Sequence, residues 1–190
     1  MFVESAGEPS FHTDAVIPFD IEEGNVLSEN VWTQDLKVEQ SIYGSLLVMT
    51  MQEEFKALDT FLKDTAQKHD LTGLRQEAVK NVKASGYATS YYYITASVSS
   101  EEIRESTETY LNNKSMDVNE VRQLVNTEAY NPEDLLITIN FYMNKEGLEP
   151  DDTLLEQILE ELKEVEGLPR GSYMVLIHDN LIGKKISYRR

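Results

Sequence analysis

The sequence predicts a single α+β domain, with one mixed or antiparallel sheet of about four to six strands and helices packed on one side. A strand–helix–strand pattern between residues 134 and 178 gives the clearest support. From residue 35 onward, the rest of the chain also alternates between strand-like and helix-like hydrophobic periods. The 190 residues fit one domain with a substantial core. We therefore expect residues 35–190 to form this domain and residues 1–34 to form an extended arm or covering segment.

The C-terminal β-α-β unit begins with a predicted strand over residues 135–143. Apolar side chains fall at every second position there, the period of a strand with one buried face: Leu135, Ile137, Ile139, Phe141 and Met143. The intervening positions are half polar. β-branched and aromatic residues suit such a half-buried surface, which strengthens the prediction.

A helix is predicted over residues 151–165 because the hydrophobic period then changes to three and four residues. Asp151 and Asp152 can cap its first N–H groups, and Gly167 and Pro169 end the pattern. The segment 173–177 is apolar at every position, so we expect an interior strand that is buried on both faces.

The region 36–84 allows more than one interpretation. Alternation over residues 36–42 predicts a strand, and three-and-four spacing predicts a helix over 45–69. The segment 42–51 is so apolar that a strand there remains an alternative. A second helix is predicted over 72–84.

Tyr87 to Val98 has the composition of a strand, followed by helices over 99–111 and 117–125. Ser99 or Ser100 provides the N-cap of the first helix. After residue 177, an Asp-Asn pair or the segment 183–185 can turn the chain, so residues 181–188 are expected to pair back as a hairpin.

Residues 1–34 show little periodicity and contain short apolar clusters, such as 15–17 and Phe19, between Gly and Pro residues. The formal net charge of -17 disfavours binding to nucleic acid or docking on anionic membranes, because both need basic residues. It favours a protein partner that is itself basic, although most acidic proteins are simply soluble ones. No apolar run is long enough to span a bilayer, so direct membrane insertion is not expected.

Neither a cofactor nor a metal ion is expected from the motifs of the chain. The sequence has no phosphate-binding Gly-rich loop, no nucleophile elbow and no zinc motif, and its three histidines are far apart. The acidic residues around Pro150 offer the oxygen ligands that calcium prefers, but helix capping explains them without a metal. The chain has no cysteine, which excludes disulfides and thiolate chemistry.

Two surfaces are candidates for binding a partner. Tyr91 and Tyr93 fall on one face of the predicted strand, and exposed tyrosines bury area at low entropic cost. The exposed face of the helix 151–165 is expected to carry Glu156, Glu160, Glu161 and Glu164, which suit a basic partner. Glu156, Glu160 and Glu164 are the candidate partner-binding residues. The alternatives are a tyrosine run that is simply core and rim, and a glutamate face that is simply solvated.

The sequence does not identify a specific function. A non-catalytic binding, interaction or accessory domain fits best, because catalytic motifs are missing while two contact surfaces are present. The alternatives are an acidic inhibitor or immunity-type protein that binds a basic partner, and a hydrolase with a carboxylate pair. We expect either a cytoplasmic protein or the extracytoplasmic part of a protein whose signal or anchor lies outside this sequence.

Overall fold

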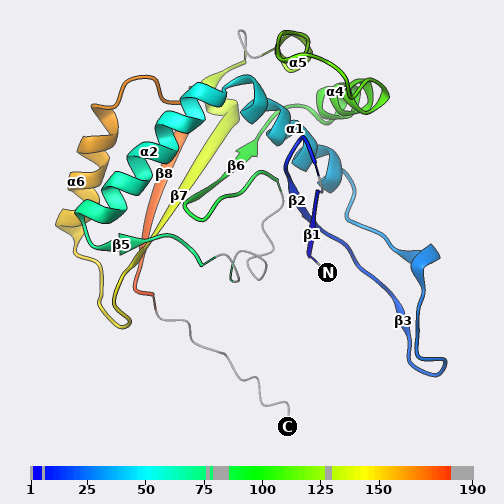
Figure 1. Ribbon diagram of the computed structural model, residues 1–190, viewed down its shortest axis with the longest axis horizontal. Helices are drawn as coiled ribbons and strands as arrows, with labels where there is room; N and C mark the ends of the chain where they lie inside the picture. Colours follow the sequence, from blue (N-terminus) through cyan, green and yellow to red (C-terminus); the bar gives the residue numbers. More distant parts are fainter. Residues whose placement is uncertain (1, 6, 76–77, 79–85, 127–129, 181–190) are drawn as a thin grey trace.

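The computed structural model describes residues 2–5, 7–75, 78, 86–126 and 130–180, and its centre is a four-stranded mixed sheet (Figure 1). The middle strand is β7 (Leu135–Met143). Strands β5 (Leu71–Thr72) and β6 (Tyr92–Ala96) pair with it antiparallel, and β8 (Ser172–His178) pairs with it in parallel. The predicted α+β class and mixed sheet are therefore confirmed.

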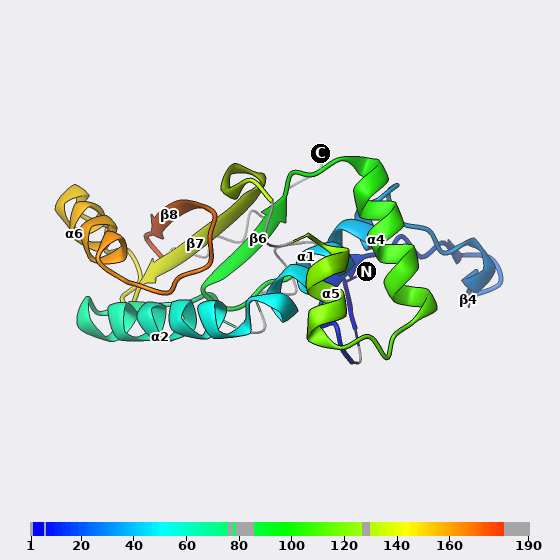
Figure 2. The same ribbon diagram turned by 90° about the horizontal axis from the view of Figure 1, so that it is seen from above.

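Three helices cover one face of this sheet, as expected: α1 (Lys37–Thr50), α2 (Gln52–Lys68) and α6 (Asp152–Lys163) (Figures 1 and 2). The covered face carries the alternating apolar side chains of β7, all of them buried. Helices α4 (Ser100–Asn112) and α5 (Val118–Leu124) pack against α1 at one end of the molecule. No helix in the described part of the chain is long and apolar enough to cross a membrane.

The C-terminal unit has the predicted order of strand, helix and parallel strand. Asp151 is the N-cap of α6, and its carboxylate accepts a hydrogen bond of 2.9 Å from the backbone N–H of Thr153. The expectation that the last strand is buried on both faces is wrong. Met174 and Leu176 are 45% and 37% exposed, because the helices cover only the opposite face.

The predicted strand 36–42 and the alternative strand 42–51 are both wrong, since these residues belong to α1. Almost every residue from Ser41 to Val48 is buried, so the helix is apolar around most of its circumference and lacks the expected stripe. The helix expected over 45–69 is instead two helices, which meet at Met51.

The remaining predictions vary in outcome. Ser99 caps α4 and Asp117 caps α5 within a full capping box, so both helices are confirmed. Strand β6 is shorter than predicted, because Thr89 forms a turn in which its hydroxyl accepts hydrogen bonds from the N–H groups of Tyr91 and Tyr92. Most of the helix expected over 72–84 and the hairpin expected over 181–188 lie outside the described residues.

The N-terminal segment forms two hairpins. Strands β1 (Phe2–Glu4) and β2 (His12–Asp14) pair with each other and pack against α1. Strands β3 (Phe19–Asp20) and β4 (Asn25–Val26) form a second hairpin, followed by a short 3-10 helix at Ser28–Asn30. This second hairpin projects away from the helices and the sheet in both views (Figures 1 and 2). We call residues 16–32 the arm.

Candidate functional site

The tip of the arm is a tight turn that its sequence specifies. The carboxylate of Asp20 accepts hydrogen bonds of 2.8 and 3.0 Å from the backbone N–H groups of Glu22 and Glu23. Gly24 then takes the left-handed conformation, with φ of 69°, which glycine adopts without steric cost. This local chemistry holds a hairpin whose strands are only two residues long.

The base of the arm is fixed to the rest of the molecule. The backbones of Val16 and Trp32 exchange two hydrogen bonds of 2.8 and 3.1 Å. Next to this bridge, the hydroxyl of Thr33 donates to the carbonyl of Asp14 over 3.0 Å, and Lys37 forms an ion pair with the Asp14 carboxylate. The arm therefore leaves the domain at a defined point.

The arm carries most of the large apolar side chains that are exposed in the described part of the chain. In that part of the chain, twelve such side chains are exposed, of which five are scattered over α4, α5, a loop and β8. The other seven lie in the arm: Val16, Phe19, Ile21, Val26, Leu27, Val31 and Trp32. Ile21 at the tip is 88% exposed, and Phe19 and Trp32 are each 56% exposed. Such a concentration on a monomer is typical of an interaction site.

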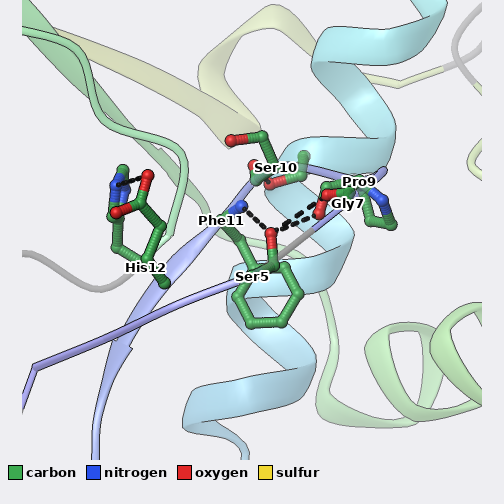
Figure 3. Close-up of polar contacts among 8 residues, drawn as sticks. Ser5, Gly7, Pro9, Ser10, Phe11 and His12 are labelled. Atoms are coloured by element: carbon green, nitrogen blue, oxygen red, sulfur yellow. Dashed lines mark hydrogen bonds and ion pairs between the residues drawn. The ribbon is translucent and has the colours of Figure 1, made fainter.

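The β1–β2 hairpin has a loop that a single serine organises (Figure 3). The Ser5 hydroxyl donates to the carbonyl of Pro9 over 2.8 Å and accepts from the N–H of Phe11 over 3.0 Å. From α1, the hydroxyl of Ser45 donates to the carbonyl of Ser10 over 2.6 Å. These bonds hold the loop against α1 and fix the position of Glu8 within it.

A cavity of about 280 Å³ lies where this loop meets the two long helices. Its wall combines acidic, hydroxyl, amide and aromatic groups: Glu8, Ser10, Ser45, Val48, Met49, Gln52, Phe55, Lys56, Asp59 and Tyr87. Burial raises the pKa of the Asp59 carboxyl, an effect that nearby Lys63 partly offsets. Burial also raises the pKa of Tyr87, and the charges of Asp59 and Glu8 add to that effect.

The structure separates the two tyrosines that the sequence places on one face. Tyr91 directly precedes β6, and its ring packs edge-on against the buried ring of Phe141, with 6.0 Å between the two centroids. Tyr93 is half-buried and pairs with Thr138 on β7, on the face that the helices leave open. The most exposed apolar side chains of that face belong to Met174 and Leu176. A role of Tyr91 and Tyr93 in binding a partner stays a prediction.

Three of the four glutamates predicted on the acidic face of α6 are exposed, Glu156, Glu160 and Glu164. The prediction is wrong for Glu161, which is half-buried because its carboxylate contacts Lys68 at 2.8 Å and His69 at 3.0 Å at the end of α2. The hydrogen bond from Lys68 is the main reason why the pKa of Glu161 is lowered.

Further acidic side chains are exposed well away from α6: Glu22, Glu23, Glu29, Glu101, Glu105 and Glu108. These residues lie on the arm and on α4. The negative charge is thus spread over several elements rather than gathered on one face.

The described residues contain no group of three or more His, Cys, Asp or Glu side chains that could hold a metal ion. Two carboxylates in this part of the chain have shifted pKa values, Asp59 and Glu161. Asp59 lies in the cavity wall, whereas Glu161 lies where α6 contacts the end of α2, so the two do not form the carboxylate pair that the hydrolase hypothesis requires in this cavity.

The arm is the candidate site that sequence reasoning missed. The lack of a hydrophobic period predicts an extended arm or covering segment over residues 1–34, but it does not predict that the large apolar side chains stay exposed. The signal was present, because Phe19, Ile21 and Val26 flank an Asp-to-Gly turn of a hairpin too short to bury them.

Comparison with known proteins addresses the family rather than the site. A search of curated proteins gives no match. Among solved structures, a crystal structure of a DUF1672 family protein from Staphylococcus aureus subsp. aureus Mu50 shares the fold, with a TM-score of 0.67 at 20% identity, over 94% of this chain and 68% of that one. The family model described as "Protein of unknown function (DUF1672)" matches residues 1–189. The chain therefore belongs to the DUF1672 family.

Proposed function

We propose that this protein is a non-catalytic binding protein that docks a protein partner through the arm. The observation that carries this proposal is the concentration of seven exposed, large apolar side chains within residues 16–32. Leaving such side chains in water costs roughly 1.5–3 kcal/mol each relative to burying them. A partner that covers them would recover part of this free energy.

The composition of the arm supports protein binding. Trp32 and Phe19 are large aromatic residues, and such residues dominate the binding energy of many protein interfaces. The turn at Asp20 and the backbone bridge between Val16 and Trp32 hold the hairpin in one conformation. A preorganised arm loses less conformational entropy on binding than a flexible peptide does.

The charges around the arm favour a partner with a basic rim. Glu22, Glu23 and Glu29 are exposed beside the apolar side chains, and the whole chain has a net charge of -17. An apolar centre with a charged rim is the usual anatomy of a protein interface, and complementary rim charges mainly raise the association rate. Because the other carboxylates are spread over α4 and α6, no single acidic face supports the inhibitor hypothesis.

The proposal can be tested by capturing partners from a lysate of the source organism with three variants of the protein. One variant carries Ile21→Ser and Trp32→Ser on the arm, the second carries Met174→Ser and Leu176→Ser on the open sheet face, and the third carries Glu160→Lys and Glu164→Lys on α6. We expect the arm variant to lose the partner that the wild type captures, while the sheet-face variant retains it.

High salt should slow binding without abolishing it, since apolar burial supplies most of the affinity. Sedimentation velocity of the purified protein shows whether the captured partner is a second copy of this chain. An arm variant that retained every partner would overturn the proposal. If only the α6 variant lost the partner, the acidic helix rather than the arm would be the binding surface.

A further inference from the structure

The cavity between the β1–β2 loop, α1 and α2 contains an arrangement that the arm does not use. Asp59 on α2 and Glu8 on the loop both contribute carboxylates to its wall. The negative charge of each carboxylate raises the pKa of the Tyr87 phenol. Tyr87 lines the same cavity, so the two carboxylates and the phenol share one wall.

The carboxylates are not neutralised by a cation buried with them. Lys56 is the one basic residue in the described wall of the cavity. Its side chain is 76% exposed, and its nearest acidic partner is Glu53 at 3.8 Å, outside the cavity wall. Lys63 lowers the pKa of Asp59, but the opposing effect of burial is larger. The ionised form of Asp59 is thus only partly compensated.

A buried hydroxyl group lies behind the same wall. Tyr92 is 1% exposed, so its hydroxyl group is enclosed by the protein. Burial raises the pKa of this tyrosine, and the charges and hydrogen bonds of Tyr87 and Asp59 raise it further. Tyr87 and Asp59 both line the cavity, so the buried hydroxyl supports these two wall residues from behind.

The aromatic rings of Phe55 and Tyr87 line the cavity, and the ring of Tyr92 packs behind them. The Phe55 and Tyr92 rings are stacked with centroids 5.9 Å apart, and the Tyr87 ring lies 6.3 Å from Phe55 and 6.1 Å from Tyr92. Aromatic faces beside carboxylates are the usual environment for an organic cation, which gains from the ring quadrupole as well as from the negative charge.

The loop side of the cavity wall is preorganised by hydrogen bonds within the protein. Ser5 holds the loop that carries Glu8 and Ser10 through the hydrogen bonds shown in Figure 3. The hydroxyl of Ser45 holds the same loop on α1 through its bond to the carbonyl of Ser10. The volume of about 280 Å³ is just below the range of about 300–1,000 Å³ that is common for small-molecule sites, so the ligand must be small.

We propose that this cavity binds an organic cation, an alkylammonium or guanidinium group, between Asp59, Glu8 and the aromatic rings. The cation can come from a free small amine or from a lysine or arginine side chain of a protein partner. This inference is independent of the arm, because none of the residues involved belongs to residues 16–32.

Isothermal titration calorimetry of the full chain at low ionic strength tests the proposal. Cadaverine serves as the free amine, Nα-acetyl-lysine methylamide as a lysine side chain within a peptide, and 1-pentanol as an uncharged probe of similar length. We expect at least one of the two amines to bind and 1-pentanol not to bind. Binding of the blocked lysine would indicate a protein side chain as the source, and binding of cadaverine alone would indicate a free amine.

Matched variants locate the binding. Asp59→Asn should weaken the amine at least tenfold, whereas Asp64→Asn, which removes the same charge from an exposed position of the same helix, should leave the affinity unchanged. Glu8→Gln should weaken binding severalfold. Because Glu8 is exposed on the loop, this substitution should not disturb the fold, so it keeps the test valid if Asp59→Asn does. The proposal fails if neither amine binds, or if the Asp59, Glu8 and Asp64 variants all bind equally well.

Discussion

The arm and the β7–α6–β8 unit use apolar residues in opposite ways. In the β-α-β unit, apolar side chains recur at strand or helix spacing, and those on the inner face, such as Ile137 and Ile158, are completely buried. In the arm, the apolar residues follow no period and remain exposed, as Ile21 shows. Regular spacing lets one face of an element be covered, whereas a hairpin with two-residue strands has no such face to offer. The contrast indicates that the β-α-β unit supplies stability, whereas the arm leaves its apolar side chains available for the contact that we propose.

The largest expected effect on stability comes from β7. Phe141→Ala should lower the free energy of unfolding by about 3–5 kcal/mol, because the ring is fully buried and its loss leaves a cavity. Trp32→Ala on the arm should change it by no more than about 0.5 kcal/mol, since its side chain is already in water. Urea denaturation followed by far-UV circular dichroism measures both. If both variants lost a similar free energy of unfolding, the arm would stabilise the fold as much as β7 does, and the contrast between the two regions would be wrong.

A smaller effect is expected where the chain enters β8. A Cβ atom added at Gly171 would lie 2.8 Å from the carbonyl oxygen of Leu135, a backbone atom that cannot move aside easily. Gly171→Ala should therefore cost about 1–3 kcal/mol through overpacking. Gly7→Ala is the matched control, because open space surrounds that position. Equal stability of the two variants in the same denaturation experiment would show that the start of β8 tolerates displacement.

The ion pair between α2 and α6 should contribute less. Glu161→Gln removes the carboxylate that Lys68 and His69 contact, at a cost of about 0.5–1 kcal/mol near neutral pH. Since the pKa of Glu161 is lowered in the folded state, its contribution is present above the unfolded-state pKa and is lost as the pH falls through the lowered value. Melting temperatures of wild type and variant should converge in acid. A constant difference at all pH values would exclude this electrostatic origin.

The smallest effect, of opposite sign, is expected at Asp59. Burial raises its pKa, so the folded state holds the proton more tightly than the unfolded state does. Ionisation of Asp59 therefore costs stability as the pH rises above its unfolded-state pKa, and this cost is absent below it. Asp59→Asn should melt slightly above wild type at neutral pH, with a gain that disappears in acid. A lower melting temperature at neutral pH would show that the ionised carboxylate stabilises the fold.

Those parts of the fold that carry local signals could be predicted from the sequence. The β7–α6–β8 order followed from periods of two and then three to four residues, and caps such as Ser99 and Asp117 placed α4 and α5. Helix α1 could not be recognised in the same way. It is buried around most of its circumference, which removes the hydrophobic stripe and leaves an apolar run that also fits a strand.

The candidate sites were harder to predict, because they depend on tertiary packing. Alternation placed Tyr91 beside Tyr93, but the turn at Thr89 ends the strand and directs Tyr91 toward Phe141. Glu8 and Asp59 are far apart in the sequence, yet both line the cavity, and the hydrogen bond from Ser45 to Ser10 holds the loop that carries Glu8 on α1. The exposed glutamates of α6 were predicted correctly as exposed, since helical spacing alone decides their face.

Site-specific photo-crosslinking tests most directly the central claim that the arm is the binding surface. A photo-reactive amino acid is placed at position 21 at the tip of the arm, or at position 174 on the open sheet face, and the protein is irradiated in a lysate of the source organism. The claim predicts a discrete crosslinked protein from position 21 and none from position 174. A discrete adduct from position 174 together with none from position 21 would contradict it.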